Sequence, residues 1–504
     1  MNEAASRLAH LSPQKLGLLL KRVKEKDGPT QIRVIPREQG INRFPLSYAQ
    51  QRMWLLDQLN PGRSLNNMPN TWTIEGPLDV AALQSALTEL CRRHETLRTT
   101  FAVHAGQPVQ VVNPVEPVPL PVCDLSTLPQ PMRRPEALRV AGEWISLPFD
   151  LERGPLLRAC LLKFNQEHHA ILLILHHIIT DGWSFRNLTH ELSILYGAHS
   201  RSDKFPLPEL DIQYGDYAVW QRERVEGKLF EKQLSYWKGQ LKGVPAFTEL
   251  PFDRPRRAIS NHRGGFRVSN FTPELSTQIK ELNQRTGVTL FMSTLAAFQL
   301  LLHHYSGQHD ICVGSPSAGR RHRQTENLIG FFINTLVLRT TFSDNPTFTE
   351  LLSRVRETYL GAHAHQDVPF ERLVAELKPD QSRGQTPFFQ VWFALQNNRR
   401  EKPSFDGLIL RPFNQSVRIA QFDLALILCE EGDQISCGLI WDRDLFDPET
   451  AEQILKDYEA LLKQVTANPE QRIAEIPFEP NSRSQSSEAL IDDDTWPNEE
   501  QFVF

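Results

Sequence analysis

The sequence predicts a mixed α/β fold built as two comparable lobes. At 504 residues the chain is longer than one compact core normally accommodates, so two domains are expected. Helical stretches alternate with short apolar runs from about residue 44, and a second such series begins near residue 267. Hydrophobic residues make up 40% and charged residues 23% of the chain, which is typical of a globular protein.

The N-terminal region, residues 1–39, is expected to contain one short helix followed by a linker. Residues 11–26 begin with Ser12, a favourable N-cap, and Pro13, and the last turn is basic. The leucines of this helix could pack on this chain or on a partner, and we expect the first. The N-terminus has no apolar core of the kind that secretory signals require, so a cytoplasmic location is expected.

The first lobe is expected over residues 40–210. Residues 79–94 show the spacing of an amphipathic helix, whereas residues 158–164 and 170–175 are short apolar runs typical of buried strands. A proline-rich stretch from 103 to 137 predicts loops and short strands.

A helical linker over residues 211–266 is expected to lead into the second lobe, residues 267–478. At the end of this linker, Gly264 and Gly265 predict a turn. The last segment, residues 479–504, is polar and acidic and too poor in apolar residues to fold alone. We expect it to be a disordered tail.

Composition and motifs exclude several classes of function. Six cysteines without any C-x-x-C pair predict reduced thiols, and a net charge of −5 with interleaved signs offers no nucleic-acid surface. No unbroken apolar stretch is long enough to cross a bilayer, so no membrane association is expected. The chain also lacks a phosphate-binding loop, a G-x-S-x-G nucleophile elbow and a dinucleotide fingerprint.

The most informative stretch runs from residue 170 to residue 185. His176 and His177 follow a buried strand, and Asp181 and Gly182 come after a three-residue spacer, as a turn requires. His177 could then face a cavity as a base or hydrogen-bond partner, while Asp181 holds the loop by an ion pair. Gly182 would let a substrate approach the backbone.

A pair of adjacent histidines does not establish catalysis alone. His168 and His169 form another pair, at an expected hairpin and without a following Asp-Gly, so the first pair could equally be structural. A zinc site is disfavoured because His176, His177 and Asp181 lack the usual spacing of ligands. We therefore expect no metal.

As a set, these residues resemble the condensation domains of nonribosomal peptide synthetases, which are related in fold to chloramphenicol acetyltransferase. Residues 176–182, HHIITDG, match the HHxxxDG signature of that family. Further blocks occur in the order expected of the family, over about residues 40–470: PLSYAQQRMWLL (45–56), RRHETLRTTF (92–101), YGDYAVWQ (214–221), IGFFINTLVLR (329–339), HQDVPFERLV (365–374) and TPFFQVWFALQN (386–397).

The resemblance implies an α+β two-layer sandwich in which two chloramphenicol acetyltransferase-like lobes form a V-shaped pseudodimer with a central tunnel. Phosphopantetheine arms of two carrier proteins would enter the tunnel from opposite faces, one with an acyl donor and the other with an amine acceptor. The implied activity is acyl transfer that forms an amide, or an ester. The chain itself would bind no cofactor, because both substrates arrive on phosphopantetheine.

The resemblance also implies roles for single residues. His177 would be the active-site histidine and His176 mainly structural. Asp181 would pair with an arginine, for which Arg98 and Arg320 are the candidates in their respective blocks.

Two further groups close to the signature are expected to contact the reacting atoms. The Gly182 amide and the Ser184 hydroxyl would stabilise the developing oxyanion or the leaving thiolate. The blocks SYAQQRMW and YGDYAVWQ look most like members that join an L-configured donor to an L-configured acceptor, and members that add a fatty acyl group are close.

No adenylation or carrier domain follows the condensation region, so we expect a free-standing monomer, with a terminal fragment as the alternative. Donor and acceptor carrier proteins and other synthetase modules would then be its partners in trans. Two other functions stay open: a non-catalytic module that docks carriers or tailoring enzymes, and an acyltransferase that uses a soluble small acceptor.

Overall fold

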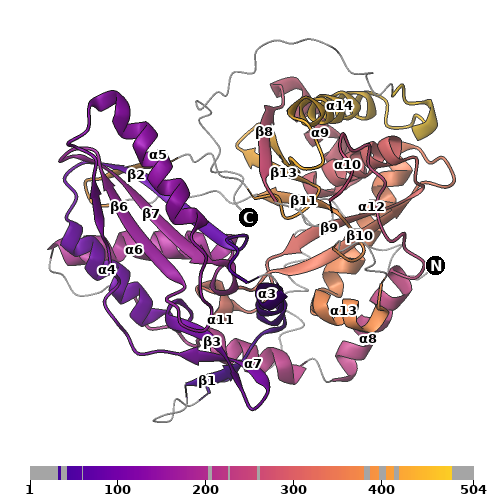
Figure 1. Cartoon of the computed structure of the whole chain (residues 1–504). Coiled ribbons are helices and arrows are strands. Elements are labelled where there is room, and N and C mark those ends of the chain that lie inside the picture. The colour runs from indigo at the N-terminus through magenta and orange to yellow at the C-terminus, as the bar shows by residue number, and fades with distance from the viewer. Residues whose placement is uncertain are drawn as a thin grey trace.

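Two lobes lean apart like the arms of a V, and helices α7 and α8 lie near its base (Figure 1). The linker predicted over residues 211–266 contains both of these helices, α7 (Tyr214–Arg224) and α8 (Lys228–Gln240). The helix predicted at the N-terminus and the tail predicted at the C-terminus lie outside the described residues. The computed structural model describes residues 32–35, 42–59, 61–201, 207–224, 227–257, 262–379, 386–396, 405–413 and 419–478.

The first lobe is a five-stranded sheet covered by helices. The strands predicted at 158–164 and 170–175 and the helix predicted at 79–94 are confirmed, within about two residues at each end. Strand β7 is buried along nearly its whole length, which explains its unbroken apolar sequence. In sheet order the strands are β12 (Ile409–Pro412), β2 (Asn67–Glu75), β7 (His168–His176), β6 (Leu157–Lys163) and β5 (Val122–Asp124), and the helices are α4 (Val80–Arg93), α5 (Gln130–Ser146) and α6 (Gly182–Arg201).

A smaller sheet joins β1 (Arg43–Pro45), β4 (Gln107–Val112) and β3 (Thr99–His104), and helix α3 (Tyr48–Leu59) follows β1. The proline-rich stretch contains the short strands expected of it, but its last part forms the beginning of helix α5. Pro131 lies in the first turn of α5, where a proline costs no hydrogen bond within the helix, whereas Pro135 lies inside the helix and removes one.

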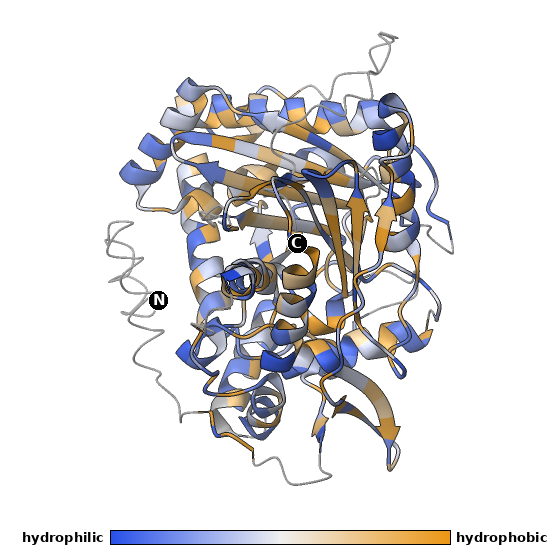
Figure 2. Ribbon diagram, turned by 90° about the vertical axis from the view of Figure 1, so that its left-hand side faces the viewer, coloured by the Kyte–Doolittle hydropathy of each residue, from blue (hydrophilic) through white to orange (hydrophobic). Residues whose placement is uncertain are grey.

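The second lobe is a six-stranded sheet with helices packed against it. Hydrophobic residues dominate its strands, whereas the outer helices mix hydrophobic and hydrophilic residues (Figure 2). In sheet order the strands are β10 (Asn334–Thr341), β9 (Asp310–Ser317), β11 (Val391–Gln396), β13 (Leu424–Glu431), β14 (Gln434–Asp442) and β8 (Gly264–Asn270). Its helices are α9 (Pro273–Thr286), α10 (Leu290–Ser306), α12 (Phe348–Ala364), α13 (Phe370–Leu377) and α14 (Pro448–Ala467). The short helix α11 (Arg323–Glu326), between β9 and β10 in the chain, lies near the base of the V (Figure 1).

The turn predicted at Gly264 and Gly265 is wrong, because both residues belong to strand β8, opposite β14. A Cβ atom on Gly265 would lie 2.1 Å from the ring of Trp441 on β14. The glycine therefore makes room for a large side chain on the neighbouring strand. Such close packing is, besides a turn, a common reason for glycine in a sequence.

The two lobes exchange segments. Strand β12 lies late in the sequence, but it pairs with β2 at the edge of the first lobe's sheet. Ile329 and Phe331, which precede β10 of the second lobe, pack in the core of the first. The ranges predicted for the lobes, 40–210 and 267–478, therefore describe the chain order rather than two separate bodies.

Among the described residues, no single helix is long and apolar enough to cross a membrane. Helices α9 and α10 meet that criterion only when taken together, and they meet at an angle of 106°. Most of the α10 side chains are buried in the core of the second lobe.

Candidate active site

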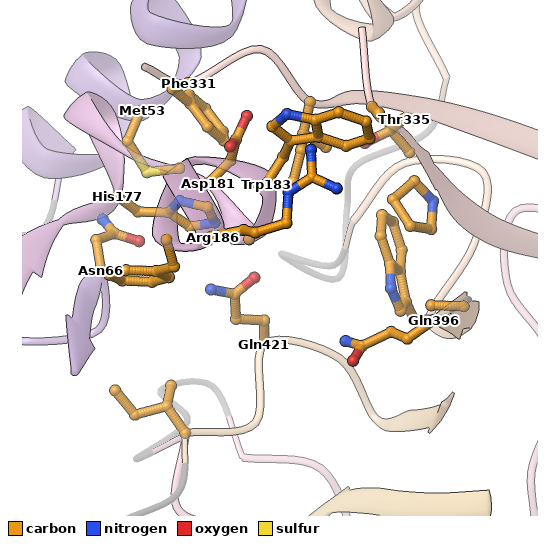
Figure 3. A pocket seen from close by; sticks show the side chains of 18 of the residues that line it. Met53, Asn66, His177, Asp181, Trp183, Arg186, Phe331, Thr335, Gln396 and Gln421 are labelled. Carbon is orange, nitrogen blue, oxygen red and sulfur yellow. The ribbon is translucent and has the colours of Figure 1, made fainter. Parts of the chain in front are cut away.

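A cavity of about 2540 Å³ lies between the lobes, and both lobes line it. His177, Asp181 and Trp183 come from the first lobe, and across the cavity Thr335 and Gln396 come from strands β10 and β11 of the second (Figure 3). The signature histidine thus stands where groups held by either lobe could meet.

His177 begins a short 3₁₀ turn, His177–Ile179, directly after strand β7. Its Nδ1 atom lies 2.7 Å from the carbonyl oxygen of Thr180, and its ring packs on Phe331 with centroids 4.6 Å apart. A carbonyl oxygen only accepts hydrogen bonds, so Nδ1 carries the proton and Nε2 of the neutral ring keeps its lone pair. Within the described residues Nε2 has no hydrogen-bond partner.

The surroundings of His177 favour the neutral ring. The side chain is only 6% exposed, and burial lowers the pKa of the imidazole below its ordinary value. The bond to Thr180 and the charge of Asp181 oppose this shift, and the charge of Arg52 adds to it. Burial prevails, and His177 therefore has an unprotonated nitrogen at neutral pH.

His176 points into the fold rather than into the cavity lining. Its Nδ1 atom accepts a hydrogen bond from the Ile178 amide at 3.1 Å, and its ring meets Phe149 edge-on. Burial lowers the pKa of His176 to about 3. These contacts suit the structural role expected of this residue.

Asp181 is buried and connects the two lobes. Its carboxylate accepts hydrogen bonds from the amide and hydroxyl of Ser184, both at 2.7 Å, and from the Phe332 amide at 3.0 Å. Arg320, in the loop after β9, completes the set with an Nη2 atom 3.2 Å from Oδ1. We call Asp181, Ser184 and Arg320 the hub; all three are buried.

The expected arginine partner of Asp181 is thus Arg320, and Arg98 is the wrong candidate. Arg98 ends a 3₁₀ turn of the first lobe, where it donates to the carbonyl of Asn113 at 2.5 Å and lies 3.9 Å from Glu95. The Arg320 guanidinium is held in place because its Nη1 atom also donates to the carbonyls of Thr325 in helix α11 and of Leu328 just after that helix.

Ser184 is not placed to touch a substrate, so its expected contact with the reacting atoms is wrong. The residue has 0% exposure, and its hydroxyl bonds to Asp181, Arg320 and the backbone of Gly330. Gly182 differs, because it lines the cavity as the first residue of helix α6. The first amides of a helix have no partner within it, so the Gly182 amide suits the contact expected of it.

A loop from the second half of the chain completes the site, and the sequence analysis gave this loop no role. Residues 327–333, which we call the crossing loop, bring Phe331 against His177 and the Phe332 amide onto Asp181. Tyr214 holds this loop by donating to the Phe331 carbonyl at 2.5 Å. Tyr214 lies in the block 214–221, and most of the crossing loop lies in the block 329–339. Both blocks resemble the same family, and this shared resemblance is the signal from which their contact could have been predicted.

Glycines allow the crossing loop to approach so closely. A Cβ atom on Gly330 would lie 2.1 Å from the Tyr214 ring. Gly319 has a φ of +66°, and a Cβ atom there would lie 1.9 Å from the Phe332 carbonyl oxygen. Backbone positions of this kind accept glycine alone without displacement.

The fold and this site together define a condensation domain, and the comparisons with known proteins agree. The family model named Condensation domain matches residues 41–486, so the chain belongs to the condensation domain family of nonribosomal peptide synthetases. One protein of the linear gramicidin synthase of Brevibacillus parabrevis is 45% identical over 446 residues, which are 88% of this chain and 6% of that protein. Chondramide synthase cmdD of Chondromyces crocatus is 41% identical over 86% of this chain and 11% of its own length. The chain thus spans a small part of these curated relatives.

Solved structures confirm the expected fold. The X-domain from teicoplanin biosynthesis superposes with a TM-score of 0.81 at 28% identity, covering 89% of this chain and 100% of that one. The first condensation domain of the calcium-dependent antibiotic synthetase gives a TM-score of 0.71 at 22% identity, over 86% of this chain and 100% of that one. At 22% identity, the second similarity shows only that the fold is the same.

Proposed function

We propose that this chain catalyses amide bond formation between an acyl thioester on one carrier protein and an amine on another. The observation that carries the proposal is the state of His177: a buried, neutral ring whose Nδ1 proton is engaged by Thr180 and whose Nε2 lone pair borders the cavity between the lobes. A group of this kind accepts a proton or orients an amine by a hydrogen bond.

The reaction needs little chemical activation, because aminolysis of a thioester is already favourable. The amine nitrogen attacks the thioester carbon, a C–N bond forms, and the C–S bond breaks when the tetrahedral intermediate collapses. His177 takes the proton that the nitrogen loses and returns it to the departing thiolate, so the enzyme ends unchanged. The Gly182 amide, at the start of helix α6, would stabilise the oxyanion.

The rest of the barrier is the meeting of two tethered groups, and the cavity between the lobes suits this task. Its volume of about 2540 Å³ exceeds that of a typical small-molecule pocket, as two extended arms require. Arg52, Arg222 and Arg372 line it, and they offer positive charge to the phosphate of a phosphopantetheine arm. No cofactor of the chain's own takes part in this scheme.

The main alternative is a module that docks other proteins without catalysis. One observation favours it: an X-domain from teicoplanin biosynthesis, 28% identical with a TM-score of 0.80, forms a complex with OxyB. The positioned lone pair of His177 favours the enzyme, because docking gives no reason to orient that nitrogen toward a cavity.

One assay separates the candidates. The purified chain is mixed with an acyl-loaded donor carrier and offered an aminoacyl carrier or a soluble amine, and products are followed by mass spectrometry. Amide on the acceptor carrier supports the proposal. Amide only on the soluble amine would indicate an acyltransferase with a small acceptor. Carrier binding without any product would indicate a docking module.

A further inference from the structure

A short N-terminal segment packs beside helix α7 and the crossing loop. In residues 32–35, which we call the strap, Ile32 is 1% exposed although the segment belongs to no helix or strand. The Ile32 amide donates to the Gln324 side chain at 3.0 Å, and the Gln324 amide group donates back to the Ile32 carbonyl at 3.3 Å. The Ile35 amide donates to Asp216 at 2.7 Å.

Ile32 belongs to a small buried cluster separate from the cores of both lobes. The cluster members come from the strap, from the approach to helix α7, from α7 itself and from the crossing loop: Ile32, Ile212, Tyr214, Tyr217, Leu328 and Phe332. In a cluster this small each side chain makes a large share of the apolar contacts. The loss of one large side chain therefore leaves much of the cluster poorly packed.

Two members of this cluster also hold the hub. The Leu328 carbonyl accepts from Arg320 Nη1 at 2.8 Å, and the Arg320 guanidinium lies 4.0 Å from the centre of the Phe332 ring. The Phe332 amide donates to Asp181, which directly precedes helix α6 and follows His177 by four residues. An unbroken series of contacts therefore runs from Ile32 to the active site.

We propose that the strap is a positioning element for the proposed reaction: Ile32 fixes the crossing loop, the loop fixes the hub, and the hub fixes His177. Ile32 touches no reacting atom. Its removal should let the crossing loop shift by a fraction of an ångström, and misplacement of about 1 Å far from the chemistry can slow an enzyme about 10²-fold.

The test compares Ile32→Ala with two controls in the full chain. Ile473→Ala removes the same side chain from a 2% exposed position in the core of the second lobe, and Val34→Ala alters a 59% exposed strap residue. Turnover at saturating carriers, KM for each carrier and Tm are measured for all three. Ile32→Ala should lower turnover about 10- to 100-fold with KM unchanged. Ile473→Ala should lower Tm and keep wild-type turnover, and Val34→Ala should change neither.

A conservative variant and a direct probe complete the test. Ile32→Val should restore most of the turnover, because it refills most of the space. The ¹³C-histidine NMR signal of His177, assigned by its loss in His177→Gln, should move in Ile32→Ala and stay in place in Ile473→Ala.

The proposal fails if Ile32→Ala matches Ile473→Ala in turnover, or if the His177 signal does not move. This inference rests on the proposed function only for the turnover measurement. If the wild-type chain forms no amide, the proposed function fails, and the NMR comparison alone decides whether the strap positions His177.

Discussion

At the scale of single residues, the chemistry depends on one hydrogen bond and one burial effect. The Thr180 carbonyl engages the Nδ1 proton of His177, and burial disfavours a second proton on the ring. Both effects leave Nε2 as an acceptor at neutral pH. The rate of the proposed reaction should therefore depend on pH.

In the proposed reaction the deprotonated ring of His177 is the active form, so a lowered pKa moves the acidic limb of the rate profile to lower pH. Turnover at saturating carriers should stay near its maximum as pH falls through about 6.5, the ordinary pKa of histidine, and should decline only at more acidic values. A kcat profile measured with stable carriers checks this. A half-maximal rate at pH 6.5 or above would contradict the assignment.

Because of the ion pair in the hub, we expect Asp181 to stabilise the folded protein. Asp181→Ala leaves Arg320 with an unpaired buried charge, which should lower the free energy of unfolding by about 3–5 kcal/mol. Asp181→Asn should cost less, because its carbonyl can still accept from the Ser184 amide. Urea unfolding measures both, with His177→Ala as the comparison. If Asp181→Ala and His177→Ala prove equally stable, the buried pair does not contribute as described.

Sequence reasoning identified His177 and Asp181 because the signature is local, but it could not decide between Arg98 and Arg320. It also assigned Ser184 to the substrate, since nothing near Ser184 in the sequence shows that its hydroxyl bonds to Gly330, 146 residues later. Partners that meet only after folding leave no mark in local spacing.

At the scale of elements, the crossing loop decides the geometry of the site. It carries Phe331 to His177 and Phe332 to Asp181, and the backbone at Gly319 permits its approach. Local sequence predicted α4, β6 and β7, because α4 has the spacing of an amphipathic helix and the two strands are short apolar runs. A loop with no periodic pattern was predicted only as part of a block that resembles the family.

Gly319→Ala tests the approach of the crossing loop. The new Cβ would meet the Phe332 carbonyl at 1.9 Å in a left-handed backbone conformation, so the loop must move. We expect a loss of stability of about 2–4 kcal/mol and a slower reaction. Gly239→Ala is the control, because a Cβ there meets nothing within 4 Å in helix α8, and it should be neutral or slightly stabilising. Wild-type unfolding and turnover in Gly319→Ala would refute this role.

At the scale of the whole molecule, the lobes are interdependent. The core of the first lobe contains side chains contributed from late in the chain: Ile329, Phe331, Phe405, Leu408 and Phe413. Sequence reasoning placed the lobes as consecutive segments because exchanged strands and loops cannot be recognised from chain order.

Residues 40–266 expressed alone should therefore fold poorly. They lack strand β12, which leaves the edge of β2 unpaired, and they lose the apolar side chains that the second half supplies. Near-UV circular dichroism and calorimetry would show weak tertiary signal and no sharp transition. A cooperative transition at the Tm of the full chain would show that the exchanged segments are dispensable.

In the proposed reaction the whole molecule has one task, which is to bring an acyl thioester and an amine to the Nε2 atom of His177. The most direct measurement is the single-turnover rate of amide formation between loaded donor and acceptor carriers, for wild type, His177→Ala and His168→Ala. His168 belongs to the other histidine pair, at the start of strand β7. We predict that His177→Ala slows the reaction about 10²–10⁴-fold, the usual effect of losing a positioned acid or base, while His168→Ala reacts at the wild-type rate. Equal rates for wild type and His177→Ala, with both proteins folded and both carriers saturating, would contradict the central claim.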